Sequence, residues 1–323
     1  MAKRARRNAT AGEPFGIRGD FEIHDERFRM LVPSNGWVEK LFTGALWAEG
    51  PAYFADTDTL LFSDIPNNRI LRWVPDGTGV GTITEYRKPS NNSNGNTRDR
   101  EGRLVTCEHG ARRVTRTELD GRITVLADRF KNKRLNSPND VVVKSDGSVW
   151  FTDPSYGILS DYEGHRGERE YGGSFVFRLD PATQKLDVVA DDFVQPNGLA
   201  FSPDEEKLYV NDTGASHDPS GPHHVRVFKV NGKTGTLQGG NVFATINPGV
   251  PDGLRVDTDG NVWISAGDGV HCYAPNGKIL GKVKVPEPVA NLVFGGPKRN
   301  RLFITATSSL YACYVTAAGA QRP

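Results

Sequence analysis

The stretch SPNDVVVKSDGSVWFTDPSYG, residues 137–157, has the composition of a β-hairpin. Two apolar, β-rich segments, VVV and VWF, flank the turn sequence KSDGS, whose Asp-Gly pair suits the connection of antiparallel strands. Polar residues stand at both ends of the hairpin: Asn139 and Asp140 come before the first strand, and Asp153 ends the second. The copies of this arrangement elsewhere in the chain decide which fold it belongs to.

The hairpin recurs at five other places. The six copies start at Glu49, Asn94, Asn139, Asn197, Asp252 and Asn291, so the spacings between them are 45, 45, 58, 55 and 39 residues. Each copy has a polar start, an apolar segment, a turn and a second β-rich segment. Repeats of this length and content are typical of four-stranded propeller blades. The sequence therefore predicts an all-β, six-bladed β-propeller that occupies residues 21–323 as one domain.

Closure of the ring requires one more strand. After the sixth copy a single strand, SLYACYV, remains before the chain ends, so the last blade lacks its outermost strand. We expect WVEKLFT, residues 37–43, to pair into that blade, because closure removes the exposed edges of an open sheet. We expect residues 1–20, which include several basic residues, to form a disordered tail.

The composition favours a soluble cytoplasmic protein. Forty Lys and Arg against 39 Asp and Glu leave a net charge of +1, which gives no support for a nucleic-acid or membrane-surface partner. The basic N-terminus is not followed by the apolar region of a signal peptide, and no apolar run is long enough to span a membrane. Three widely separated cysteines fit neither a zinc site nor a disulfide scaffold, so we expect them to be buried apolar residues. The oligomeric state stays open.

The repeat starts predict a metal site. The first strand of a propeller blade lines the central channel, so the six starting residues should converge there, and all six carry side-chain oxygens. Converging carboxylates repel one another unless a cation lies among them. An all-oxygen set suits Ca²⁺ first and then Mg²⁺ or Mn²⁺; Zn²⁺ fits less well because no His or Cys is in the set. We expect the metal ligands to be Glu49, Asn139, Asn197 and Asp252. The alternative is that these polar pairs serve as turn formers alone.

A second ring is predicted where each second strand returns to the same face. Its members are Asp64, Glu108, Asp153, Asp212, Ala266 and Ala306. From the two rings we expect Asn94 and Glu108 to contact the substrate. His109, which follows Glu108, and Asp212 are candidates for proton transfer, although His109 could equally be a structural residue at a strand end. The long loops 154–173 and 213–224 follow second strands, so they are either a lid over this face or surface insertions.

Several motifs resemble a known family. They are AEGP at 48–51, SPND at 137–140, QPNGLAFSPD at 195–204 and PDGLRVDTDGNVW at 251–263. Over residues 37–315 the chain resembles the family of gluconolactonase, regucalcin (senescence marker protein) and luciferin-regenerating enzyme. The stretch LVTCEHGARRVTR at 104–116 is similar to the bacterial gluconolactonase branch in particular. The resemblance implies a six-bladed propeller with one divalent cation in its channel and a lactone hydrolase activity.

The resemblance also implies roles for individual residues. It makes Glu49, Asn197 and Asp252 metal ligands, with Asp252 a proposed general base as well. It makes Asn139 a substrate contact, although related phosphotriesterases and paraoxonases use that position as a metal ligand. Ser137 stands where regucalcin-like members have an arginine that grips the sugar lactone. The sugar specificity of regucalcin therefore does not carry over to this chain.

Together these features predict a metal-dependent lactonase that hydrolyses a sugar-type lactone. The cation would polarise the lactone carbonyl, and Asp252 would act as the base or as the nucleophile. Two alternatives remain: an ester or organophosphate hydrolase that uses the same site, and a non-enzymatic ligand-binding propeller in which Ca²⁺ is structural.

Overall fold

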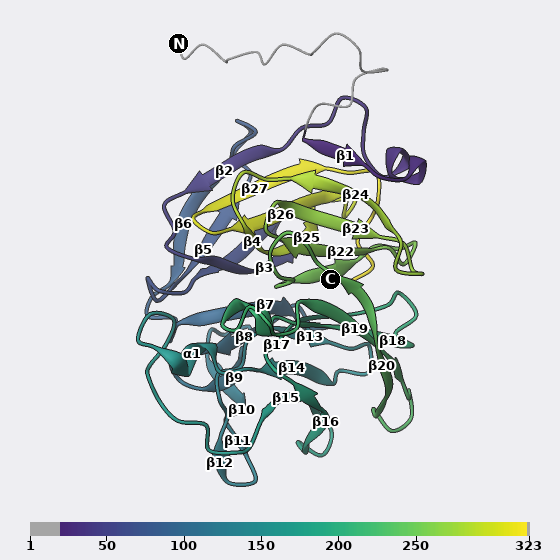
Figure 1. Cartoon of the computed structure of the whole chain (residues 1–323). Coiled ribbons are helices and arrows are strands. Elements are labelled where there is room, and N and C mark those ends of the chain that lie inside the picture. Colours follow the sequence, from purple (N-terminus) through teal and green to yellow (C-terminus); the bar gives the residue numbers. More distant parts are fainter. Residues whose placement is uncertain (1–19, 322–323) are drawn as a thin grey trace.

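The computed structural model describes residues 20–321. Six antiparallel sheets form blades around a central axis, which confirms the predicted six-bladed β-propeller (Figure 1). The predicted tail, residues 1–20, lies outside the described residues except for its last position. None of the helices in residues 20–321 has the length and hydrophobicity that a membrane crossing requires.

The first three blades follow one another along the chain. Blade 1 contains β3 (Ala48–Phe54), β4 (Thr59–Asp64), β5 (Arg69–Val74) and β6 (Thr82–Arg87). Blade 2 contains β7 (Ser93–Arg98), β8 (Leu104–Glu108), β9 (Arg113–Thr117) and β10 (Ile123–Ala127). A small two-stranded sheet, β11 (Arg129–Phe130) and β12 (Lys133–Arg134), comes next. Blade 3 contains β13 (Val141–Val143), β14 (Val149–Asp153), β15 (Ser174–Leu179) and β16 (Leu186–Phe193).

The last three blades complete the ring. Blade 4 contains β17 (Pro196–Phe201), β18 (Lys207–Asp212), β19 (His224–Val230) and β20 (Leu237–Thr245). Blade 5 contains β21 (Leu254–Val256), β22 (Val262–Ala266), β23 (Gly269–Tyr273) and β24 (Ile279–Lys284). Blade 6 contains β25 (Val289–Gly295), β26 (Arg301–Ala306) and β27 (Ser309–Tyr314). The first strand of each blade packs against the first strand of the next, and β25 packs against β3, so these strands enclose the axis.

Two N-terminal strands add to the last two blades. β2 (Glu39–Thr43) pairs antiparallel with β27, as predicted for the segment WVEKLFT. β1 (Phe21–Ile23) pairs with β24 and makes blade 5 five-stranded. β1 was not predicted from the sequence, because a three-residue strand carries too little alternation to be recognised. Phe28 in the adjoining 3₁₀ helix η1 (Glu26–Met30) is fully buried and packs next to Trp263 of blade 5.

The apolar core lies between neighbouring blades. In the described part of the chain, each pair of adjacent blades encloses a separate cluster of buried apolar side chains. The three cysteines, Cys107, Cys272 and Cys313, are free and buried, as expected. Dividing the core in this way leaves the axis itself free of apolar packing, so the channel can hold polar groups.

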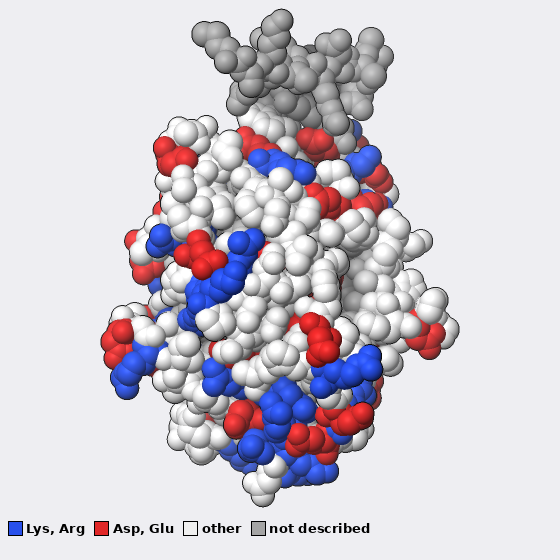
Figure 2. All heavy atoms as spheres, turned by 90° about the vertical axis from the view of Figure 1, so that its left-hand side faces the viewer, with Lys and Arg blue, Asp and Glu red and all other residues white. Residues whose placement is uncertain are grey.

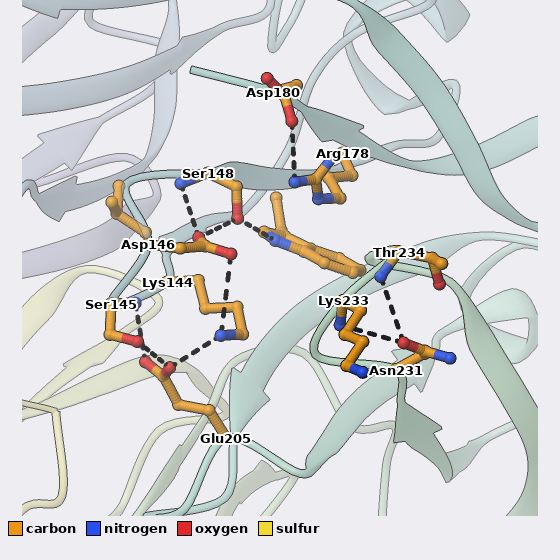
Figure 3. A network of polar contacts seen from close by, with 12 residues as sticks. Lys144, Ser145, Asp146, Ser148, Arg178, Asp180, Glu205, Asn231, Lys233 and Thr234 are labelled. Carbon is orange, nitrogen blue, oxygen red and sulfur yellow. Dashed lines mark hydrogen bonds and ion pairs between the residues drawn. The ribbon is translucent and has the colours of Figure 1, made fainter. Parts of the chain in front are cut away.

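Polar contacts join the blades at the end of the propeller where first strands turn into second strands. Glu205, in the β17–β18 turn, accepts a hydrogen bond from Lys144 Nζ at 3.0 Å and one from the Ser145 backbone N–H at 2.9 Å (Figure 3). Arg100, in the corresponding turn of blade 2, donates to Glu205 at 3.2 Å. These contacts fix the turns of three blades relative to one another. Elsewhere on the surface, the face in Figure 2 shows positive and negative side chains lying next to one another.

Candidate active site in the central channel

Glycine residues bring the repeat starts together on the axis. In four blades a glycine follows the starting residue, and it lies at the beginning of the strand rather than in a turn. Gly95 N–H donates to the Asn139 carbonyl at 2.7 Å, and Gly198 N–H donates to the Asp252 carbonyl at 2.8 Å. A Cβ on Gly95 or Gly198 would lie 2.4 or 2.3 Å from the same carbonyl oxygen. Only glycine permits this approach between blades, so these pairs are not simply turn formers.

Five of the six repeat starts line one cavity. It has a volume of about 320 Å³ and is bordered by Glu49, Asn94, Asn139, Asn197 and Asp252. Three of the strands that carry these residues have a β-bulge at this point, a feature that commonly re-aims side chains beside functional sites. The structure thus brings together every residue predicted to bind a metal.

Asn291, the sixth repeat start, does not border the cavity. Its Nδ2 donates to Glu49 Oε2 at 3.0 Å and to Asp140 Oδ2 at 3.3 Å. Asp140 stands where four other blades have glycine, and its buried side chain enters the channel beside Asn291. Asn291 therefore orients the Glu49 carboxylate from outside the cavity.

The two long loops also border the cavity. Loop 154–173 begins with the short helix α1 (Tyr156–Leu159) and contributes Tyr156 and Glu163. Loop 213–224, which contains η2 (Gly214–Ser216), contributes Thr213, Ser216 and His217. The Tyr156 hydroxyl lies 2.9 Å from Ser216 Oγ, so the loops are joined to each other. The opposite wall is mostly apolar and consists of Trp47, Gly249, Val250, Ala266, Gly267, Pro288 and Val289.

Acidic side chains dominate the titratable groups of the cavity. Burial raises the pKa of Glu49, and the nearby Asp140 raises it further. Burial, Glu49 and Glu163 together raise the pKa of Asp252 well above its usual value. Burial raises the pKa of Glu163 to about 7. Among the described residues that border the cavity there is no Lys or Arg to offset these carboxylates.

The oxygen donors fit a divalent cation. Asn94 Oδ1 and Asn197 Oδ1 are buried and have no hydrogen-bond partner, an arrangement that native proteins seldom leave unsatisfied. Carboxylate and amide oxygens are the ligands that Ca²⁺ prefers. Within residues 20–321 no cluster of three or more His, Cys, Asp or Glu side chains forms a metal site. A cation here would therefore need amide oxygens in addition to Glu49 and Asp252.

The aspartates of the predicted second ring accept hydrogen bonds from backbone N–H groups and do not border the cavity. Asp153 accepts hydrogen bonds from the N–H groups of Asn136 and Ser137, both at 2.8 Å. Asp64 does the same for Leu46 N–H at 2.9 Å. In each case the carboxylate at the end of a second strand fixes the segment that leads into the first strand.

The two second-ring residues with predicted functional roles also have structural partners, which are backbone N–H groups for Asp212 and side chains for Glu108. Asp212 accepts from the N–H groups of Val194 and Gln195 at 3.0 and 2.9 Å. Glu108 is fully buried and accepts from Arg113 Nε at 2.7 Å and Thr115 Oγ1 at 2.9 Å. The structure thus brings neither side chain to the cavity wall.

His109 lies behind the wall and is fully buried. Its Nε2 is 3.2 Å from Asn94 Nδ2, and its Nδ1 is 3.2 Å from the carbonyl oxygen of Glu163. Burial lowers the pKa of the imidazole to about 4, so the ring is neutral near pH 7. A neutral ring that donates from Nδ1 and accepts at Nε2 satisfies both contacts. His109 therefore turns the Asn94 amide so that Oδ1 is free.

Ser137, which replaces the arginine of regucalcin-like members, does not border the cavity. Its Oγ donates to the Pro154 carbonyl at 2.7 Å and accepts from Gly157 N–H at 3.0 Å. Ser137 thus fixes the start of loop 154–173. Sequence reasoning did not identify Trp47 or Glu163 individually: Trp47 directly precedes the AEGP motif, and nothing in the loop sequence distinguishes Glu163.

Comparison with known proteins identifies the family to which this fold belongs. The SMP-30/gluconolactonase/LRE-like family model matches residues 47–308. Gluconolactonase from Zymomonas mobilis is 33% identical over 296 residues, which cover 84% of this chain and 80% of that protein. The structure of a gluconolactonase from Xanthomonas campestris is 35% identical, with a TM-score of 0.84 over 95% of this chain and 98% of that one.

A more distant likeness extends to regucalcin. The structure of regucalcin from Agrobacterium tumefaciens, described as a calcium-binding protein, is 19% identical. Its TM-score is 0.69 over 88% of this chain and 94% of that chain, which shows a shared fold. With a family model that matches most of its length and a relative at 33% identity, the chain belongs to the SMP-30/gluconolactonase/LRE-like family.

Proposed function

We propose that this protein hydrolyses a sugar-type lactone at a divalent cation bound in the central channel. The observation that carries the proposal is the convergence of Glu49 and Asp252 with the unpartnered amide oxygen of Asn197 in one cavity. Membership of a family that includes gluconolactonases supports the choice of substrate. A pentonolactonase from Haloferax volcanii, 30% identical over 274 residues, adds to that support.

In this proposal Glu49, Asn197 and Asp252 hold the cation, with Asn139 as a further oxygen ligand. Ca²⁺ suits this set best, ahead of Mg²⁺ and Mn²⁺. A bound cation would act as a Lewis acid toward the lactone carbonyl. Asn94, whose Oδ1 is kept free by His109, completes the polar wall and contacts the substrate.

Asp252 is the proposed base. Of the three residues considered for proton transfer, it is the one that borders the cavity; His109 and Asp212 lie behind the wall. Its carboxylate takes a proton from the water that attacks the carbonyl carbon. When the ring C–O bond breaks, the same group returns the proton to the leaving oxygen, so that the hydroxy acid is released and Asp252 is regenerated.

The test measures hydrolysis of glucono-δ-lactone by proton release. The samples are EDTA-treated protein, protein resupplied with Ca²⁺, Mg²⁺, Mn²⁺ or Zn²⁺, Asp252→Asn, and the control Asp259→Asn, which changes an exposed carboxylate of blade 5. We expect turnover to require a cation and to fall at least about 100-fold in Asp252→Asn, with no change in Asp259→Asn. Calorimetry gives the metal affinity independently of turnover. Metal binding without turnover of any lactone or ester would instead indicate a binding propeller.

A further inference from the structure

Glu163 occupies a fixed position at the rim of the site. Loop 154–173 folds back on itself through hydrogen bonds from His165 N–H and Gly167 N–H to the carbonyls of Gly157 and Ile158, both at 3.0 Å. The carbonyl of Glu163 faces His109 Nδ1 at 3.2 Å. The backbone at Glu163 is therefore tied both to its own loop and to the wall of the channel, and its side chain borders the cavity.

The Glu163 carboxylate has no hydrogen bond or ion pair with any described residue. The other acidic groups around the channel differ in this respect: Asp153 and Asp212 each accept two backbone N–H groups, and Glu49 accepts from Asn291. Burial of a carboxylate without donors costs free energy, which is why burial alone raises the pKa of Glu163. An unpaired carboxylate at a cavity wall is left free to meet groups of a bound molecule.

The charges around the cavity do not balance even with a cation present. Asp140, which lies in the channel beside Asn291, is paired with the buried Arg255, whose Nη1 is 3.8 Å from Asp140 Oδ2. A divalent ion would offset Glu49 and Asp252, and Glu163 would leave one negative charge. No Lys or Arg borders the cavity within the described residues. An anionic group on a substrate would meet this charge without compensation, whereas hydroxyl groups could donate hydrogen bonds to it.

We propose that Glu163 is a specificity-determining residue that selects uncharged, hydroxylated lactones and excludes lactones that carry a phosphate or another anionic group. The proposal rests on the lactonase function proposed above. Glu163 accepts hydrogen bonds from substrate hydroxyls, as carboxylates do most strongly when ionised. The same charge repels an anionic substituent that enters beside the loop. Coulomb repulsion between two unit charges at a partly buried site corresponds to a discrimination of about 10- to 50-fold.

The experiment compares kcat/KM for glucono-δ-lactone and for its 6-phosphate at about pH 8, where an acid with a pKa of about 7 is ionised. The proteins are the wild type, Glu163→Gln and the matched control Glu168→Gln, which changes an exposed carboxylate on the same loop. We expect the wild type to prefer the neutral lactone. Glu163→Gln should raise kcat/KM for the 6-phosphate about 10-fold and raise KM for the neutral lactone a few-fold. Glu168→Gln should change neither.

A second readout separates this inference from the proposed function. Calorimetry with the corresponding non-hydrolysable lactam and its 6-phosphate reports on selection without any turnover. Weak binding of the phosphorylated lactam that improves in Glu163→Gln supports the inference even if no lactone is hydrolysed. The inference is overturned if the wild type accepts both forms equally, if Glu163→Gln leaves the preference unchanged, or if Glu168→Gln shifts it as much. Thermal melting of each variant confirms that it is folded.

Discussion

Replacement of Asp212 by Asn distinguishes a structural carboxylate from a catalytic one. Asp212 accepts two backbone N–H groups, from Val194 and Gln195, at 3.0 and 2.9 Å. An asparagine has the same shape but offers one acceptor oxygen, and its NH₂ group would face the other N–H donor. A hydrogen bond to a charged acceptor contributes about 1.5–3 kcal/mol, and an unsatisfied buried donor adds a further penalty. We therefore expect Asp212→Asn to lower the free energy of unfolding by about 2–4 kcal/mol.

Urea denaturation measures the loss, and initial rates on glucono-δ-lactone measure activity per folded molecule. We expect kcat/KM of Asp212→Asn to stay within about threefold of the wild type, because the carboxylate does not border the cavity. Asp252→Asn should behave in the opposite way, with little loss of stability and a loss of activity typical of a missing general base. A loss of more than about 100-fold in activity for Asp212→Asn, with unchanged unfolding, would refute this reasoning and return Asp212 to the catalytic candidates.

Three further predictions follow from contacts around the channel. In metal-free protein the raised pKa values of Glu49 and Asp252 mean that the folded state binds more protons than the unfolded state. The free energy of unfolding should therefore fall as the pH rises from about 5 to about 8, and added Ca²⁺ should remove most of this dependence in melting curves. Gly198→Ala should lower the free energy of unfolding by at least about 2 kcal/mol, because the added Cβ would lie 2.3 Å from the Asp252 carbonyl oxygen. The same displacement should weaken metal binding in calorimetry, and an unchanged metal affinity would contradict this. His109→Leu should reduce kcat/KM about 10-fold, because Asn94 would lose the contact that orients its amide. The shape of the pH–rate profile should stay unaltered, because a group with a pKa of about 4 is already neutral near pH 7. Loss of an inflection near pH 6.5 would instead indicate proton transfer by His109.

The sequence was sufficient to predict the ring of oxygen donors. A repeat fixes the same position in every blade, and propeller geometry sends that position to the axis. Glu49, Asn197 and Asp252 could therefore be grouped, although 148 residues separate the first two and 55 separate the last two. Asn291 has the same position in its repeat, but it does not border the cavity. Asp140 has a side chain where other blades have glycine, and together with Glu49 it occupies the Asn291 amide.

Other parts of the site depend on contacts that leave no pattern in the sequence. The sequence does not distinguish an acidic residue that binds substrate from one that accepts hydrogen bonds from the backbone, as Asp212 does, or from neighbouring side chains, as Glu108 does. The structural roles of these two residues were therefore not predicted. Glu163 lies in a loop without periodicity, where no neighbouring residue predicts that its carboxylate stays unpaired. The contact between His109 and Glu163 and the contact between Tyr156 and Ser216 form only when the chain folds, so the sequence alone does not predict them.

The hydrogen bonds that run from glycine N–H groups to carbonyls of the next blade have a consequence for the choice of ion. These hydrogen bonds join the main chain of Asn139 and of Asp252 to the neighbouring blade. The main chain would therefore resist contraction of the channel around a smaller cation. Mg²⁺ requires oxygen distances about 0.3–0.4 Å shorter than Ca²⁺ does. Short side chains such as Asp252 and Asn197 have only two torsion angles with which to move their oxygens closer to a smaller ion, whereas Glu49 has three. The main chain would thus add a preference for the larger ionic radius of Ca²⁺ to the preference that the oxygen ligands already have for that ion.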